Sequence, residues 1–125
     1  MDQIEIFNTK KQTSRVIQGP EGYDVEFQPM KVGENYVMSP NNKTRYAFIN
    51  GAVTDNNIYL AYSGSLFLDE NSYFGKSIYV YDWEGNPIRK LIFKKNILSL
   101  TVSDDDKTIF AYDANKGFIV QANIN

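Results

Sequence analysis

The sequence contains no cysteine and no histidine among its 125 residues. Without cysteine there are no disulfide bonds, and without either residue the usual zinc sites are excluded. The same two absences remove Cys–His and Ser–His nucleophilic pairs and the commonest general base. Any catalysis would therefore depend on Asp or Glu side chains, and we expect no cofactor.

The sequence also lacks a strong charge of either sign and long apolar runs. Its net charge is −2, with no long run of Lys or Arg, so the electrostatic footprint of a nucleic-acid or anionic-membrane partner is missing. No apolar run reaches the roughly 18 residues of a membrane span. Residues 1–15 are polar and charged and show no signal peptide. We expect no nucleic-acid partner and no transmembrane segment.

Aromatic residues are plentiful, at 14% of the chain with nine Tyr and eight Phe. Tyr and Phe favour the half-buried surfaces of pleated sheets. No stretch carries a helical period with caps. Short strands follow one another about every ten residues with turn signals between them, which is typical of an all-β domain. The composition and spacing therefore predict one all-β domain.

The most informative feature is an internal repeat. IEIFNTKKQTSRVI at residues 4–17 aligns without a gap with IYVYDWEGNPIRKL at residues 78–91. TDNNIYLAYS from Thr54 resembles SDDDKTIFAYD from Ser103, with one inserted residue. Such repeats are typical of units that bury their apolar faces only against their neighbours. The repeat predicts a partial β-propeller of antiparallel four-stranded blades, about 2.5 of them at roughly 40–50 residues each.

The predicted blades divide the chain. Residues 1–22 would supply the outer strands of one blade, residues 45–95 one whole blade and residues 96–125 an incomplete last blade. Between the first two parts, the alternating stretch 23–27 predicts a short strand and 32–38 a weaker one. Further along, residues 88–93 and 97–102 predict two separate strands. A complete small β-sandwich or barrel, with the repeat arising from hairpin chemistry alone, is the alternative architecture.

Three segments carry a family resemblance: NNIYLAYSG, SIYVYDWEGNPIRK and ILSLTVSDDDKTIFAY. Together they resemble the last two to three blades of the TolB-like six-bladed β-propellers, a family of bacterial lipoproteins and exported proteins. The similarity is strongest over residues 45–124 and weaker over 4–22. The resemblance implies the propeller fold and a periplasmic or cell-envelope setting, and it brings no catalytic residues.

Length sets this sequence apart from that family, because six blades need roughly 240–300 residues. Two interpretations follow. Either the sequence is part of a longer product, or copies of it associate through their open blade edges, which proteins normally cover or pair. The second interpretation predicts self-association.

The candidate binding residues lie in a long loop, 63–77, and in the turn that follows the next strand. Long loops on a rigid scaffold often carry function. The predicted ligand-binding residues are Phe67, Asp69, Glu70, Tyr73, Phe74 and Trp83, with the aromatic rings as a platform and the carboxylates as polar contacts. The alternative is that the loop aromatics pack against their own blade and that Trp83 covers the blade edge.

Asp104, Asp105 and Asp106 form the densest carboxylate run. They fit either a hard-cation site, since Ca²⁺ prefers several oxygen ligands, or a solvated turn between two strands. The EF-hand pattern is absent, and we expect no metal ligands here. Asp82 is expected to hydrogen-bond the backbone of its own turn.

Two functional hypotheses follow. The first is a non-enzymatic binding or scaffold module for an unknown ligand, either a carbohydrate or a protein, recognised by loops on one face of the blades. The alternative is a propeller hydrolase or lyase that uses carboxylates, or Ca²⁺, on a sugar or a lactone.

Overall fold

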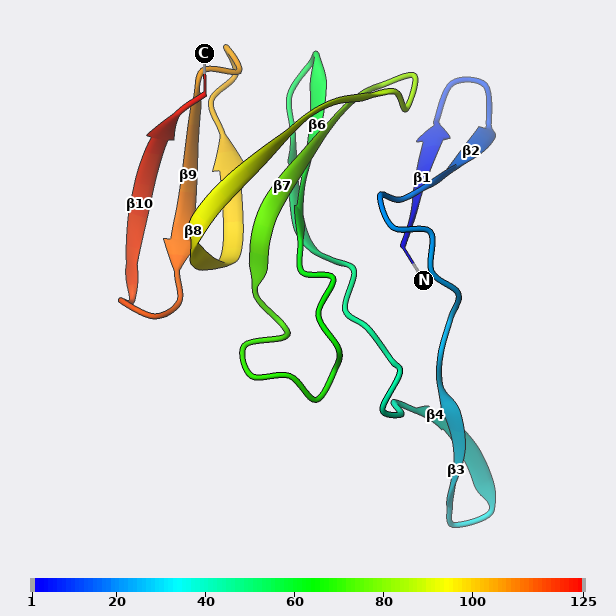
Figure 1. The fold of residues 1–125 in the computed structure, drawn as a ribbon. Coiled ribbons are helices and arrows are strands. Elements are labelled where there is room, and N and C mark those ends of the chain that lie inside the picture. The colour runs from blue at the N-terminus through cyan, green and yellow to red at the C-terminus, as the bar shows by residue number, and fades with distance from the viewer. Residues whose placement is uncertain (1, 125) are drawn as a thin grey trace.

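The computed structural model describes residues 2–124, and this part of the chain is entirely β-strand, turn and loop (Figure 1). The strands pair antiparallel throughout. The elements are β1 (Gln3–Asn8), β2 (Thr13–Gln18), β3 (Gln28–Val32), β4 (Asn35–Ser39), β5 (Phe48–Val53), β6 (Asn57–Tyr62), β7 (Gly75–Asp82), β8 (Pro87–Val102), β9 (Thr108–Asp113) and β10 (Phe118–Asn123).

The main body is one six-stranded sheet with the order β10-β9-β8-β7-β6-β5. Its centre is β8, a strand of 16 residues. The first half of β8 pairs with β7 and its second half with β9. A register shift between Ile97 and Leu100 bends the strand, and the sheet curls so that β9 and β10 lie over the layer formed by β5 to β7 (Figure 1). The predicted partial propeller is confirmed at this level.

The core lies between the two layers of the curled sheet. Side chains alternate across each strand, so one face of β6 and β7 meets one face of β8 and β9. At the inner edge the backbone N–H of Leu100 donates to Oδ1 of Asn50, at 3.1 Å. This bond ties the second layer to β5. The fully buried members of the core include Tyr59, Ala61, Ile78, Val80, Ile97, Ile109 and Ala111.

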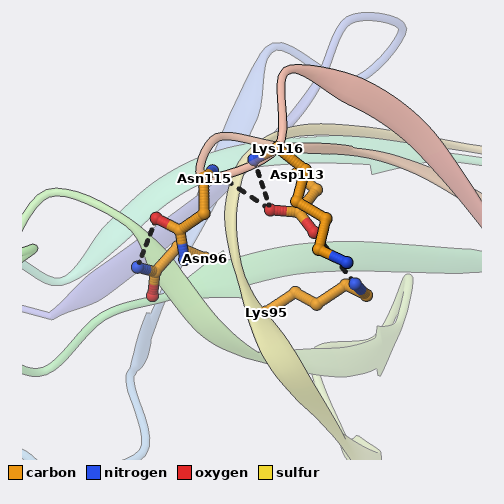
Figure 2. Close-up of polar contacts among 5 residues, drawn as sticks. All are labelled: Lys95, Asn96, Asp113, Asn115 and Lys116. Atoms are coloured by element: carbon orange, nitrogen blue, oxygen red, sulfur yellow. Dashed lines mark hydrogen bonds and ion pairs between the residues drawn. The ribbon is translucent and has the colours of Figure 1, made fainter.

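A buried carboxylate holds the bend of β8 (Figure 2). Asp113, at the end of β9, is 1% exposed. It accepts from Nζ of Lys95 at 3.0 Å and from the backbone N–H groups of Asn115 and Lys116 at 3.1 and 3.3 Å. Nδ2 of Asn96 donates to Oδ1 of Asn115 at 3.2 Å. The β9–β10 turn is thereby attached to β8 where that strand passes between layers.

The β1–β2 hairpin is joined to the main sheet through Asp2, which precedes β1, and Tyr62, the last residue of β6. The buried Asp2 accepts from Nε2 of Gln18 at 2.9 Å, from the backbone N–H of Glu21 at 2.8 Å and from the hydroxyl of Tyr62 at 3.3 Å. Burial of the Tyr62 hydroxyl, with nearby Tyr23 adding to the effect, raises its pKa well above the usual range. These contacts bring the N-terminal segment against the main sheet.

Two predictions about the connecting segment were wrong. Residues 23–27 are extended but form no strand, because an alternating pattern needs a neighbour to pair with; the hydroxyl of Tyr23 instead donates to the carbonyl of Tyr46 at 2.9 Å. Residues 32–38 belong to a hairpin of two strands, β3 and β4, that turns at Gly33 with φ of +62°. This hairpin projects away from the main sheet (Figure 1).

A third difference concerns β8. The sequence predicts separate strands at 88–93 and 97–102, whereas the structure has one continuous strand, because its first half pairs with β7 and its second half with β9. The division into 1–22, 45–95 and 96–125 stays a prediction. Within residues 2–124 there is no helix long and apolar enough to cross a membrane.

Candidate functional site

The predicted binding residues do not come together. Phe67, Asp69, Glu70, Tyr73 and Phe74 lie in the loop that precedes β7, and Trp83 follows the last residue of that strand. Eight residues of strand at about 3.3 Å each place the two groups roughly 25 Å apart, at opposite ends of the sheet. A single small ligand therefore does not contact both groups within one molecule.

The β6–β7 loop is held by contacts within itself and with residues 44–47. Phe67 packs on Tyr46, with ring centroids 5.6 Å apart. Oδ2 of Asp69 accepts from the backbone N–H of Leu66 at 3.1 Å. Phe74 is 8% exposed, whereas Tyr73 beside it is 52% exposed. Phe67 and Asp69 thus make contacts that shape the loop and are still exposed, Phe74 is buried, and Tyr73 and Glu70 lie at the surface.

Trp83 stands on a rigid turn between β7 and β8. The carboxylate of Asp82 accepts from both the backbone N–H and Nδ2 of Asn86, each at 2.8 Å. The N–H of Gly85 donates to the carbonyl of Asp82 at 3.0 Å. The side-chain bond from Asn86, followed by that from its backbone, lowers the pKa of Asp82 below 3.8. The expectation that Asp82 serves its own turn is confirmed.

The indole of Trp83 is both exposed and oriented. It is 43% exposed, and its Nε1 donates to the carbonyl of Thr54 at 3.2 Å. The ring is therefore fixed between the β5–β6 turn and its own turn. It borders two hollows, one on each side. The first has a volume of about 430 Å³ and is lined by Val53, Thr54, Asp55 and Asp104 as well as Trp83.

The second hollow, of about 320 Å³, lies between Trp83 and the β1–β2 hairpin. It is lined by two cations, Lys11 and Arg15, whereas the first hollow is lined by the carboxylates of Asp55 and Asp104. Nη1 of Arg15 donates to the backbone carbonyl of Glu84, which joins the hairpin to the Trp83 turn. The remaining lining residues are Ile6, Asn8, Thr13 and Ser14.

The carboxylates of the aspartate run beside this end of the sheet accept hydrogen bonds from neighbouring side chains. Asp106 accepts from Thr54 Oγ1 at 2.7 Å, from Asn56 Nδ2 at 2.9 Å and from the Tyr59 hydroxyl at 2.8 Å. Partial burial alone raises the pKa of Asp106, but these hydrogen bonds outweigh it and lower the pKa from 3.8 to about 2. Asp105 accepts from Ser103 Oγ at 2.7 Å.

The carboxylates of this run are therefore spread over different partners. Among residues 2–124, no three Asp, Glu, His or Cys side chains are grouped so that they would hold a metal ion.

Sequence reasoning missed Lys11 and Arg15. A signal was available in the repeat, which pairs residues 4–17 with 78–91. Because repeated units of this kind stack on their neighbours, the turn containing Lys11 is expected beside the turn containing Trp83. What the repeat does not give is the direction of the side chains, which decides that both cations line a hollow with the indole.

The antiparallel layers, joined by one strand that passes from the first layer to the second, define the class as a partial β-propeller. A sequence model of the TolB-like 6-blade propeller-like family matches residues 1–105, so the chain belongs to this family. The match includes the β1–β2 hairpin, over which the resemblance of the sequence is weaker. A search of curated proteins found no match. Family membership gives the fold and names no reaction or ligand.

Proposed function

We propose that this chain is a non-enzymatic binding module whose recognition surface lies around Trp83. The observation that carries the proposal is the indole itself, which is half exposed, oriented by its bond to Thr54 and bordered by two hollows of opposite charge. Binding sites are commonly concave, with an aromatic wall and a few converging polar groups. Trp is also among the residues that carry most binding energy at interfaces.

The nearby carboxylates support binding over acid–base chemistry. A general acid near neutral pH needs a raised pKa. The pKa values of Asp82 and Asp106 are lowered, because hydrogen bonds from Asn86 and from the β5–β6 segment favour the charged forms. Both carboxylates accept hydrogen bonds that stabilise turns, which is a structural role.

The ligand we propose is a carbohydrate, with a protein surface as the second possibility for the same end of the sheet. A periplasmic or cell-envelope setting, as implied for the family, would bring such ligands within reach. The β6–β7 loop is a separate, second candidate site in this proposal, since Tyr73 and Glu70 are exposed at the opposite end of the sheet.

A glycan array tests the proposal. The purified chain is applied to immobilised neutral and acidic glycans, together with the Trp83→Leu and Phe67→Leu variants. We expect binding that is lost in Trp83→Leu and kept in Phe67→Leu, because Phe67 lies about 25 Å away at the other end of β7. Circular dichroism melts of both variants check that they are folded.

Two results would contradict the proposal. Binding that depends on Phe67 and not on Trp83 would move the site to the β6–β7 loop. Turnover of a bound glycan that a single carboxylate substitution abolishes would make the protein an enzyme. Product analysis of the bound glycan after prolonged incubation decides the second point.

A further inference from the structure

We infer that the hollow between Trp83 and the β1–β2 hairpin binds an acidic saccharide, with the sugar ring on the indole and its carboxylate on Lys11 and Arg15. This inference rests on the proposed binding function and names the chemical class of its ligand. It is carried by the composition of the hollow: one aromatic face, two cations and three short polar side chains around about 320 Å³.

The aromatic wall suits a ring with an apolar face. Trp offers a large, flat surface and one polar N–H. In this chain that N–H is taken up by the carbonyl of Thr54, so the indole presents its ring, and not its donor, to a ligand. Sugar rings carry C–H groups on one face and can stack on such a surface, while their hydroxyl groups point to the sides.

The cations supply the preference for a negative charge. Arg15 is held in place by its bond to the Glu84 carbonyl, and a guanidinium has five N–H donors, so others remain for a carboxylate. Lys11 adds a second charge from the turn of the hairpin. Charge-assisted hydrogen bonds are roughly twice as strong as neutral ones. The hollow on the other side of Trp83, which carries Asp55 and Asp104, would repel the same group.

The remaining lining matches hydroxyl groups. Thr13 and Ser14 can donate and accept, and Asn8 has an amide for both. The carboxamide oxygen of Asn8 already accepts from the backbone N–H groups of Lys10 and Lys11, at 3.1 and 2.9 Å. These bonds fix the turn that carries Lys11. The site is therefore assembled on two rigid turns.

Fluorescence of Trp83 measures binding directly, since it is the only tryptophan. The probe is trigalacturonate, and the matched neutral probe is the same trisaccharide with all carboxylates methyl-esterified. We expect a saturable change in Trp83 emission with the acid, weaker binding of the ester and weaker binding at higher salt, because exposed charges are screened. The Lys11→Ala variant should bind the acid about three- to tenfold more weakly, as expected for one charged contact.

Lys10→Ala is the matched control, because it removes the same charge from the neighbouring position of the same exposed turn and does not line the hollow. Its affinity should equal that of the unmodified chain. Equal binding of acid and ester would overturn the acidic class and leave the binding function standing. The acidic class would also be overturned, and the binding function kept, if Trp83 emission does not respond to trigalacturonate although the glycan array shows Trp83-dependent binding of other glycans. No Trp83-dependent binding of any glycan would defeat both proposals.

Discussion

Gly85 allows two parts of the molecule to meet at the Trp83 turn. Its φ is +87°, a region that residues with a Cβ adopt only with strain, and a Cβ at this position would overlap the side chain of Ile17 in β2. The Gly85→Ala variant should therefore lose about 1–3 kcal/mol of stability from backbone strain, with a further loss from the overlap. Urea denaturation measures the change.

Gly33 provides the comparison for that prediction. Its φ is +62°, yet a Cβ there would have no heavy atom within 4 Å, because the β3–β4 turn is open to solvent. Gly33→Ala imposes similar strain with no overlap, and it does so in a hairpin that projects from the main sheet. We expect it to shift the urea midpoint clearly less than Gly85→Ala. Equal shifts would mean that the contact between Ile17 of β2 and the β7–β8 turn at Gly85 does not contribute to the loss of stability.

Asp106 predicts a specific dependence of stability on pH. Its pKa is about 2 in the folded protein and near 3.8 without its hydrogen bonds. A carboxyl whose pKa is lower when folded stabilises the protein fully above the unfolded pKa, and loses that contribution as the pH falls through the folded pKa. The Asp106→Asn variant should be less stable at pH 7 and show a flatter fall in melting temperature between about pH 4 and pH 2.

Asn also suits the backbone of position 106, where φ is +58°. The substitution therefore tests the carboxylate, meaning its charge and its second acceptor oxygen, and leaves the backbone of the turn unchanged. Asp104→Asn is the control, because Asp104 is exposed in the same turn and makes none of the Asp106 bonds. Thermal melts of both variants across that pH range should separate them, and identical pH profiles would contradict the assignment.

At the scale of elements, the bend in β8 depends on Asp113. It accepts from Lys95 and from two backbone N–H groups of the β9–β10 turn (Figure 2). The bond from Lys95 is the main cause that lowers the pKa of Asp113. Asp113→Ala should lower the melting temperature more than Lys95→Met, since only the first leaves the backbone N–H of Asn115 without its acceptor.

Hydrogen exchange locates the effect of these two variants. In Asp113→Ala the amides of β10 should exchange faster, because the turn that positions this strand has lost its anchor. In Lys95→Met the backbone bonds to Asp113 stay, and protection of β10 should be kept. Equal loss of protection in the two variants would assign the role to the ion pair alone.

At the scale of the whole molecule, the outer face of the second layer is apolar and uncovered. Phe110 and Tyr112 in β9 are 37% and 36% exposed, and Ile119 in β10 is 71% exposed. They share one face because Ile119 is paired with Tyr112. Burial of a few hundred Å² of such surface stabilises by several kcal/mol at about 25 cal/mol per Å². We propose that copies of the chain associate through this face and the open edge of β10.

Light scattering at micromolar concentration should give a mass above that of one chain. The Ile119→Lys variant should shift the protein toward the monomer. Leu68→Lys is the control, because Leu68 is 73% exposed and lies in the β6–β7 loop, outside the β9–β10 face and the edge of β10. A monomeric unmodified chain with a cooperative melt would contradict the proposal.

The sequence by itself determined the all-β class, the blade repeat and most strand positions, because period-two alternation and turn residues are local signals. The hairpin within residues 78–91 became β7, its turn and the first part of β8, as predicted from the turn residues Glu84-Gly85-Asn86-Pro87. Local signals also gave the role of Asp82, whose partner Asn86 is only four residues away.

Only the tertiary structure decided which side chains share a site. Lys11 and Trp83 are 72 residues apart in sequence (83 − 11 = 72), and they line one hollow because the β1–β2 hairpin packs beside the β7–β8 turn. Phe67 and Trp83 are only 16 apart (83 − 67 = 16), yet β7 separates them. Whether a strand pairs is likewise decided by a neighbour, which residues 23–27 lack and β8 has along both of its halves. Which side chains meet, and which strands pair, cannot be read from their distance along the chain, because both are determined by how the layers pack.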